Sequence, residues 1–175
     1  MKKIFLFIPL ITIILISIFC FIFLLQKKDP TKPPSVLLNK NLPDFDIINL
    51  FDDTDVISNK TLKGNIMIIN FFASWCAPCK AEHPLFFEIK KKYPKIILIG
   101  INFKDKKEEA INYLNTMDNP YDYVGVDSNG LIGLELGVFG LPETFIVNSK
   151  GIITYKHLGP LTRKIIKNEV APFIQ

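Results

Sequence analysis

Two kinds of hydrophobic pattern divide the chain. The first is a single run from Ile4 to Leu25, which contains 22 residues without a charge and is long enough to cross a bilayer as a helix. After residue 36, short apolar runs that predict buried strands alternate with stretches of helical periodicity. This alternation is typical of an α/β domain.

The predicted strands and helices follow one another along residues 36–175. An edge strand is predicted over 42–48, buried strands over 66–72 and 95–101, and a short strand over 123–126. The segments 144–147 and 152–155 are predicted to form an antiparallel hairpin around Asn148-Ser149-Lys150-Gly151. Helices are predicted over 77–92, with a kink at Pro84, over 107–117 and 131–136, and in a terminal segment that contains Leu161, Ile165, Ile166 and Val170.

The front of the chain predicts membrane attachment. Residues 1–3 are a short cytoplasmic stub, 4–25 a transmembrane anchor, 26–35 a proline-rich tether and 36–175 the domain. A cleaved secretory signal normally has about 7 to 15 apolar residues followed by small residues at the cleavage site, and the segment shows neither feature. Cys20 is expected to be a thiol within the span. The economical topology places the amino terminus in the cytoplasm and the domain outside.

Charge narrows the range of partners. The chain has a formal net charge of +4, but residues 36–175 hold 16 basic and 16 acidic residues. A neutral domain gives no support for a nucleic-acid partner. The lysines on both sides of the apolar run are interpreted as membrane-flanking charges.

The hexapeptide Trp75-Cys76-Ala77-Pro78-Cys79-Lys80 carries the candidate chemistry. Two cysteines with this spacing, placed between a predicted strand and a predicted helix, suggest a redox dithiol. The amino end of a helix stabilises a thiolate, so Cys76 is the expected attacking sulfur, and Cys79 is close enough to form a disulfide with it. Such a pair transfers two electrons without a metal or organic cofactor.

Two other interpretations of the cysteine pair are open, a structural disulfide and half of a zinc site. Zinc needs about four ligands. Only His83 and His157 are further strong candidates in the domain, so no metal is expected.

The order of strand, Trp-Cys-x-Pro-Cys, helix, strand and helix, followed by a hairpin and a helix, resembles the thioredoxin fold. Three segments, 75–83, 100–105 and 137–145, are similar to the DsbE/CcmG family, the membrane-anchored thiol:disulfide interchange proteins of cytochrome c maturation. The resemblance covers the chain from about Leu42 to its end. Phe103 stands where many relatives have tyrosine, which removes a hydroxyl but no step of the chemistry.

The resemblance implies a bacterial inner-membrane protein whose domain faces the periplasm. It would keep the haem-attachment cysteines of apocytochrome c, or of a partner that handles them, reduced in an oxidising compartment. Electrons would come from a membrane-embedded thiol transporter, and no haem ligand is expected. Alternatives are a broader extracytoplasmic thioredoxin-like reductase, a copper chaperone of thioredoxin-like fold and a non-catalytic interaction module.

Roles can be assigned to the residues around the dithiol. Cys76 would attack the substrate disulfide and Cys79 would resolve the mixed disulfide. Trp75 would shield the site and offer a surface to the partner, and Pro78 is accepted in the first helical turn. By resemblance, Pro142 would form a cis bond opposite the dithiol and present the backbone of Leu141 to an extended substrate.

Two carboxylates are candidates for tuning the sulfurs. Glu82 lies three residues after Cys79, and Glu143 follows Pro142. A nearby negative charge would raise the pKa of Cys76, or a carboxylate could take the Cys79 proton. The alternative for Glu82 is a solvated acid on the helix surface. His83 is expected at the surface or just behind the site.

Overall fold

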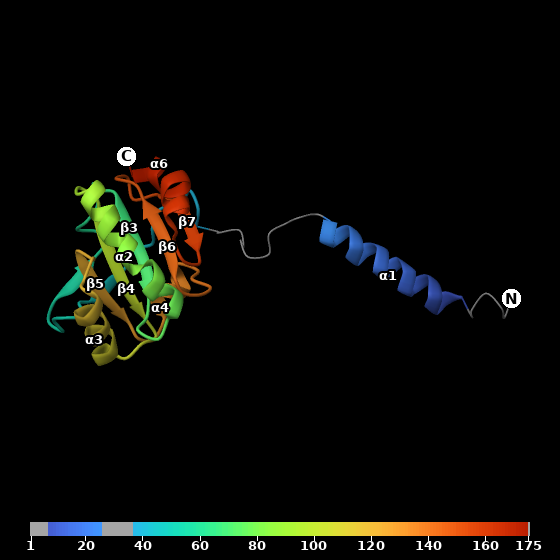
Figure 1. Cartoon of the computed structure of the whole chain (residues 1–175), viewed down its shortest axis with the longest axis horizontal. Helices are drawn as coiled ribbons and strands as arrows, with labels where there is room; N and C mark the ends of the chain where they lie inside the picture. Colours follow the sequence, from blue (N-terminus) through green and yellow to red (C-terminus); the bar gives the residue numbers. More distant parts are fainter. Residues whose placement is uncertain (1–6, 26–36, 175) are drawn as a thin grey trace. The chain divides into compact units, whose positions relative to one another are not determined.

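The computed structural model describes residues 7–25 and 37–174 in two separate units (Figure 1). The first contains the apolar helix α1, Ile8–Leu25. No helix within these described ranges is both long and apolar enough to cross a membrane. The predicted stub 1–3, the tether 26–35 and the start of the predicted anchor 4–25 lie outside the described residues, so this domain arrangement stays a prediction.

The second unit is built on a five-stranded mixed sheet in the order β5-β4-β3-β6-β7 (Figure 1). The parallel strands are β3, Met67–Phe72, β4, Ile97–Phe103, and β5, Tyr123–Asp127. The strand β6, Glu143–Val147, pairs antiparallel with both β3 and β7, Ile153–Leu158. All six residues of β3 are buried, as expected for an apolar strand at the centre of a sheet covered on both faces. The predicted α/β architecture and its hairpin are confirmed.

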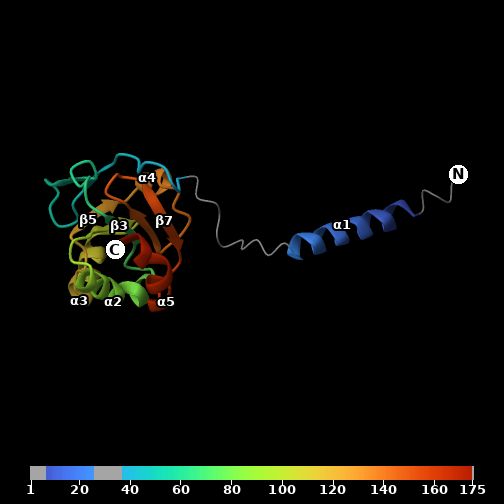
Figure 2. The same cartoon turned by 90° about the horizontal axis from the view of Figure 1, so that it is seen from above.

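Helices cover one face of this sheet (Figure 2). They are α2, Ala77–Lys92, α3, Lys107–Met117, and a terminal segment made of α5, Arg163–Ile165, the π-helix η2, Ile166–Val170, and α6, Ala171–Ile174. The core on this side includes Phe72, Phe86, Ile89, Leu114 and Val170. The helix α2 continues through Pro84. Its buried residues Phe86 and Ile89 follow the proline and belong to the same helix as the residues before it.

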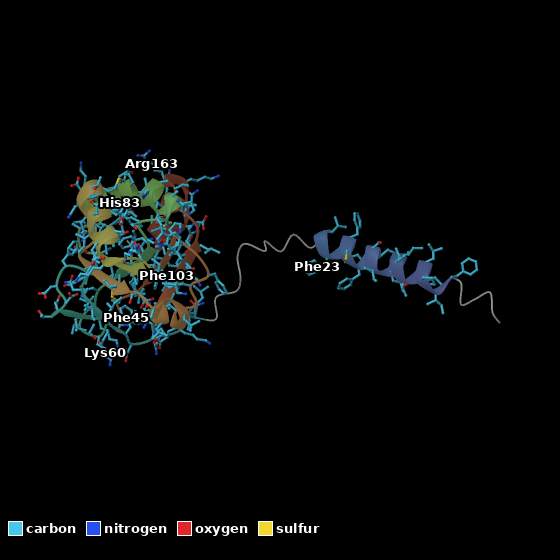
Figure 3. All side chains as sticks on the ribbon, turned by 90° about the horizontal axis from the view of Figure 1, so that it is seen from below. Phe23, Phe45, Lys60, His83, Phe103 and Arg163 are labelled. Atoms are coloured by element: carbon cyan, nitrogen blue, oxygen red, sulfur yellow. A yellow bond between two sulfur atoms is a disulfide. The ribbon has the colours of Figure 1, made fainter. Side chains whose placement is uncertain are left out.

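A hairpin and a short helix cover the opposite face. The hairpin consists of β1, Asp46–Ile48, and β2, Val56–Ser58, and the helix α4 is Leu131–Glu135. Phe45 packs in the core on this side, whereas His83 lies on the side of α2 (Figure 3). The prediction of an edge strand over 42–48 was wrong in part, because β1 pairs with the unpredicted strand β2 in a sheet of its own.

The hairpin is placed by a close backbone contact. Asn49 forms an isolated bridge with Gly125 of β5. A Cβ atom added to Gly125 would lie 2.6 Å from Ile47. The absence of a side chain at this glycine therefore lets Ile47 lie flat against the sheet.

Candidate active site

The two cysteines lie at the junction between β3 and α2. Cys76 is the N-cap of α2, and its sulfur accepts a hydrogen bond of 3.2 Å from the backbone N–H of Cys79. The two residues form a disulfide with their Cα atoms 5.3 Å apart, which confirms the predicted pair. Only 3% of Cys76 and 2% of Cys79 is exposed. Once the disulfide is reduced, the same N–H group and the helix dipole favour a thiolate on Cys76.

The loop before Cys76 is held in place by a neighbouring loop. The Asp105 carboxylate accepts from the Ser74 N–H at 2.6 Å and from the Ser74 hydroxyl at 2.9 Å. The Trp75 indole N–H donates to the Lys104 carbonyl oxygen at 3.3 Å, while 61% of the Trp75 residue is exposed. Trp75 therefore lies on the surface beside the dithiol, with its indole nitrogen bonded to the Lys104 loop.

Trp75 also borders an open groove of about 1020 Å³. Its other walls include Lys80 at the start of α2, Asp105, and Tyr113 and Met117 of α3. The Lys80 ammonium lies 5.9 Å from the centre of the Tyr113 ring.

Pro142 approaches the site from the other side. The Leu141-Pro142 peptide bond is cis, as predicted. Phe71 of β3 pairs with Glu143 of β6, so the residues after Phe71 and those before Glu143 meet at the same edge of the sheet. The dithiol and the Leu141-Pro142 bond are thereby brought together.

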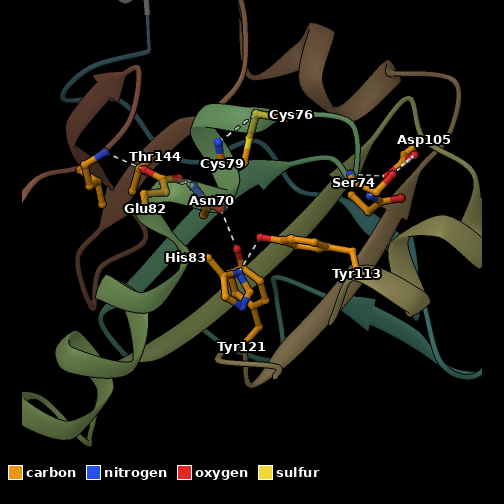
Figure 4. Close-up of a disulfide and its surroundings, with 12 residues drawn as sticks. Asn70, Ser74, Cys76, Cys79, Glu82, His83, Asp105, Tyr113, Tyr121 and Thr144 are labelled. Atoms are coloured by element: carbon orange, nitrogen blue, oxygen red, sulfur yellow. Dashed lines mark hydrogen bonds between the residues drawn. A yellow bond between two sulfur atoms is a disulfide. The ribbon is translucent and has the colours of Figure 1, made fainter. Parts of the chain in front are cut away.

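The structure buries Glu82 behind the dithiol, on the same face of the sheet (Figure 4). Its carboxylate accepts from the Leu161 N–H at 2.6 Å and from the Asn70 amide at 2.9 Å. Burial raises the pKa of this carboxyl from its ordinary 4.5 to about 7, and the two hydrogen bonds oppose the rise. The alternative of a solvated acid on the helix surface was wrong.

Glu143 is buried too, but its side chain does not face the sulfurs. Asn70 and Thr144 face α2, so the next residue along each strand, Phe71 or Glu143, points to the opposite face. There the Glu143 carboxylate lies 2.5 Å from the Lys156 ammonium and accepts from the Phe139 N–H at 2.9 Å. Strand alternation therefore contradicts the expectation that this carboxylate approaches Cys76.

His83 is buried, so of its two expected positions the one at the surface was wrong and the one just behind the site remains. One ring nitrogen, Nε2, lies 2.8 Å from the Asp118 carbonyl oxygen, which can only accept, and therefore carries the proton. The other nitrogen, Nδ1, accepts from the Tyr113 hydroxyl at 2.8 Å. Burial lowers the pKa of His83, against the opposing effect of the Asp118 carbonyl.

Sequence reasoning missed three further residues behind the dithiol. They are Asn70, Thr144 and Tyr121: Asn70 donates to Glu82 and to Thr144, and it accepts from the Tyr121 hydroxyl. The available signal was Asn70, a polar residue inside the apolar run 66–72, because a buried amide requires partners. Within the described ranges, no three His, Cys, Asp or Glu side chains are grouped so as to hold a metal ion.

A buried disulfide at the amino end of a helix, facing a cis-proline across the edge of a mixed sheet, defines a thiol:disulfide oxidoreductase of thioredoxin-like fold. Solved structures agree with this fold. The chain superposes on a thioredoxin-family thiol:disulfide interchange protein from Chlorobium tepidum with a TM-score of 0.66 and 25% identity, covering 77% of this chain and 96% of the other. A secreted disulfide oxidoreductase from Mycobacterium tuberculosis gives a TM-score of 0.64 at 17% identity, covering 73% of this chain and 95% of the other.

Sequence comparison narrows the class. The Redoxin family model matches residues 37–171. The thiol:disulfide interchange protein DsbE of Vibrio cholerae is 36% identical over 178 residues, covering 100% of this chain and 96% of the relative. The DsbE protein of Tatumella citrea is 39% identical, covering 98% and 94%. The chain belongs to the DsbE/CcmG family of thiol:disulfide interchange proteins, and its Cys76-Cys79 pair is the redox-active centre.

Proposed function

We propose that this protein reduces disulfides in the cytochrome c maturation pathway. The substrate is a disulfide formed by the haem-attachment cysteines of apocytochrome c, or by a partner that handles them. The observation that carries the reaction is the hydrogen bond from the Cys79 N–H to the Cys76 sulfur at the start of α2. The pathway is supported by the DsbE relatives, which match nearly the whole chain.

The reaction begins with the reduced dithiol. The Cys76 thiolate attacks one sulfur of the substrate disulfide, and the other substrate sulfur leaves as a thiolate. The Cys79 thiolate then attacks the Cys76 sulfur and displaces the second substrate thiolate. The substrate gains two electrons and two protons, and the Cys76-Cys79 disulfide is left behind. A membrane-embedded thiol-electron transporter would reduce it again.

Glu82 is proposed to accept the Cys79 proton. Cys79 and Glu82 are neighbours on one face of α2, since they are three residues apart, and both are buried. A carboxyl with a pKa near 7 can both take up and release a proton at neutral pH. Glu143, which faces away and pairs with Lys156, has no part in this step.

The substrate is proposed to bind between Trp75 and the Leu141-Pro142 segment. Trp75 offers an exposed aromatic surface on one side of the disulfide. On the other side, the backbone of Leu141 is placed to pair with an extended chain, in the manner of an added strand. Pro78 lies in the first turn of α2, between the N-cap Cys76 and Cys79, and its ring favours the helical backbone there.

The proposed location is the periplasmic side of the bacterial inner membrane. The uncharged run from Ile4 to Leu25 supports a retained single-pass anchor. Alkaline carbonate extraction tests it, because an anchored chain stays in the membrane pellet. Release of the full-length chain into the supernatant would contradict the anchor but would leave the proposed thiol chemistry unaffected.

A trapping experiment tests the client. In Cys79→Ser the mixed disulfide cannot be resolved, so covalent adducts with clients accumulate and appear on non-reducing gels. Cys76→Ser/Cys79→Ser, which lacks the attacking sulfur, is the matched control. Adducts with apocytochrome c or with thiol proteins of its maturation are expected. Adducts dominated by unrelated proteins would favour a broader extracytoplasmic reductase.

The reduction potential tests the direction of electron flow. A reductase needs a potential well below that of a strong disulfide-forming oxidant, which is about −120 mV. Equilibration of the protein with glutathione buffers measures it. A value near that of the oxidant would exclude the reductase role.

A further inference from the structure

Four buried side chains form one hydrogen-bonded group behind the disulfide (Figure 4). The Tyr121 hydroxyl donates to Asn70 Oδ1 at 2.8 Å. The Asn70 Nδ2 group donates to Glu82 Oε1 at 2.9 Å and to Thr144 Oγ1 at 3.0 Å. Asn70 comes from β3, Glu82 from α2, Thr144 from β6 and Tyr121 from the segment before β5. We call these four residues the Asn70 group.

Each member of the Asn70 group limits how the others can be arranged. An amide can present either its oxygen or its NH₂ to a neighbour, and only the NH₂ is attractive to a carboxylate. The Tyr121 hydroxyl holds the Asn70 oxygen on the far side, so the NH₂ faces Glu82. Loss of that hydroxyl would leave the amide oxygen without its donor inside the core, and the amide would be free to turn.

Tyr121 is itself fixed by packing. Its ring stacks on Phe72 with centroids 5.2 Å apart and planes at 15°. A Cβ atom added to Gly100 would lie 2.8 Å from the Tyr121 ring, so the ring occupies space that only a glycine leaves open. Burial raises the pKa of Tyr121 well above its usual value, so the hydroxyl keeps its proton and remains a donor at neutral pH.

We propose that Tyr121 and Asn70 are positioning residues that hold one amide N–H on the Glu82 carboxylate, and thereby set the pH at which Glu82 takes the proton from Cys79. The effect on the pH of proton transfer rests on the proposed role of Glu82 as the proton acceptor. The proton moves from the Cys79 sulfur to a Glu82 oxygen, and no electrons are transferred in this step. Asn70 and Tyr121 exchange no proton.

Two tyrosines lie close enough to Glu82 to interact with its charge, Tyr113 on α3 and Tyr121 before β5. The other titratable groups on the neighbouring elements are Cys79 and His83 on α2 and His157, which pairs with Thr144 of β6. The terminal segment contributes the Leu161 N–H. In the oxidised protein the cysteines do not titrate. Measuring that state separates Glu82 from the thiols, and comparison with Glu82→Gln separates it from the histidines.

The decisive measurement is the titration of the Glu82 carboxyl by carbon NMR in the oxidised full-length protein in detergent micelles. Glu82→Gln identifies the resonance by its loss. In Tyr121→Phe the titration midpoint is expected to rise by about 0.5 to 1 pH unit, because the ionised carboxylate loses one oriented donor. The matched control is Tyr113→Phe, whose hydroxyl bonds His83 and not Asn70, and its midpoint is expected to match that of the wild type.

Asn70→Ala provides a second route to the same answer. It removes the donor itself, so its midpoint is expected to rise at least as much as that of Tyr121→Phe, and it decides the question if Tyr121→Phe does not fold. An unchanged or lowered midpoint in a folded variant would overturn the positioning role.

The kinetic measurement is a separate test. The pH profile of kcat/KM should move with the midpoint, and an unchanged profile in Glu82→Gln would reject the proton-acceptor role while leaving the positioning result intact.

Discussion

Glu82→Gln tests whether burial of this carboxyl makes the fold sensitive to pH. The pKa of Glu82 is raised from its ordinary 4.5 to about 7, so the folded state binds the proton more tightly than the unfolded chain. The contribution of Glu82 to stability is therefore full below pH 4.5 and is lost as the pH rises to about 7. A shift of about 2.5 pH units corresponds to about 3 kcal/mol of unfolding free energy. Glutamine has nearly the shape of the protonated acid and carries no charge.

Urea denaturation of the oxidised protein between pH 4 and pH 8.5 measures this effect. We expect the unfolding free energy of Glu82→Gln to gain about 3 kcal/mol relative to the wild type across that range. The two proteins are compared by the difference in their unfolding free energies, because His83 changes stability with pH in the direction opposite to Glu82. Its pKa is lowered, so it contributes stability that is lost as the pH falls, and it does so in both proteins.

A parallel pH dependence in the two proteins would refute this reasoning. It would mean that Glu82 is ionised in the fold at little cost, and that the Leu161 and Asn70 hydrogen bonds outweigh its desolvation. A difference of the opposite sign would mean that these hydrogen bonds lower the pKa below 4.5.

Three further predictions concern other parts of the fold. Lys156→Met leaves the buried Glu143 carboxylate without its partner and should cost about 3 to 5 kcal/mol of unfolding free energy, as measured by urea denaturation. Adding Glu143→Gln to the same chain should restore most of this loss. Trp75→Ala should lower kcat/KM for a peptide disulfide about three- to tenfold with little change for a small neutral disulfide, and equal losses would contradict a role in substrate binding. Gly100→Ala should cost about 1 to 3 kcal/mol of stability, because its methyl group meets the Tyr121 ring, and an unchanged thermal midpoint would contradict that packing.

The local pattern of apolar and polar residues was sufficient to predict much of the sheet and its helices. The predicted helix 77–92 has the bounds of α2, because Pro78 in the first turn and the apolar residues at helical spacing act within the helix itself. The strand predicted over 66–72 begins one residue too early. The central apolar runs were recognisable because strands buried on both faces carry little else.

Features that depend on distant contacts were missed. The strand β2 is three residues long and is stabilised by pairing with β1, whose Ile47 packs on Gly125. The burial of His83 depends on Tyr113, 30 residues away. The orientation of Glu143 depends on the alignment of β6 with β3. None of these contacts leaves a periodic signal in the residues involved.

The depth of the two sulfurs restricts the shape of a client. With 3% of Cys76 and 2% of Cys79 exposed, an incoming disulfide has to reach sulfurs that lie almost wholly beneath the surface. A disulfide held beneath the surface of a compact protein cannot make that approach, whereas one in a loose, extended chain can. Under the proposed function, the burial of both sulfurs would select clients by folding state and would place the reduction before the client adopts its own tertiary structure.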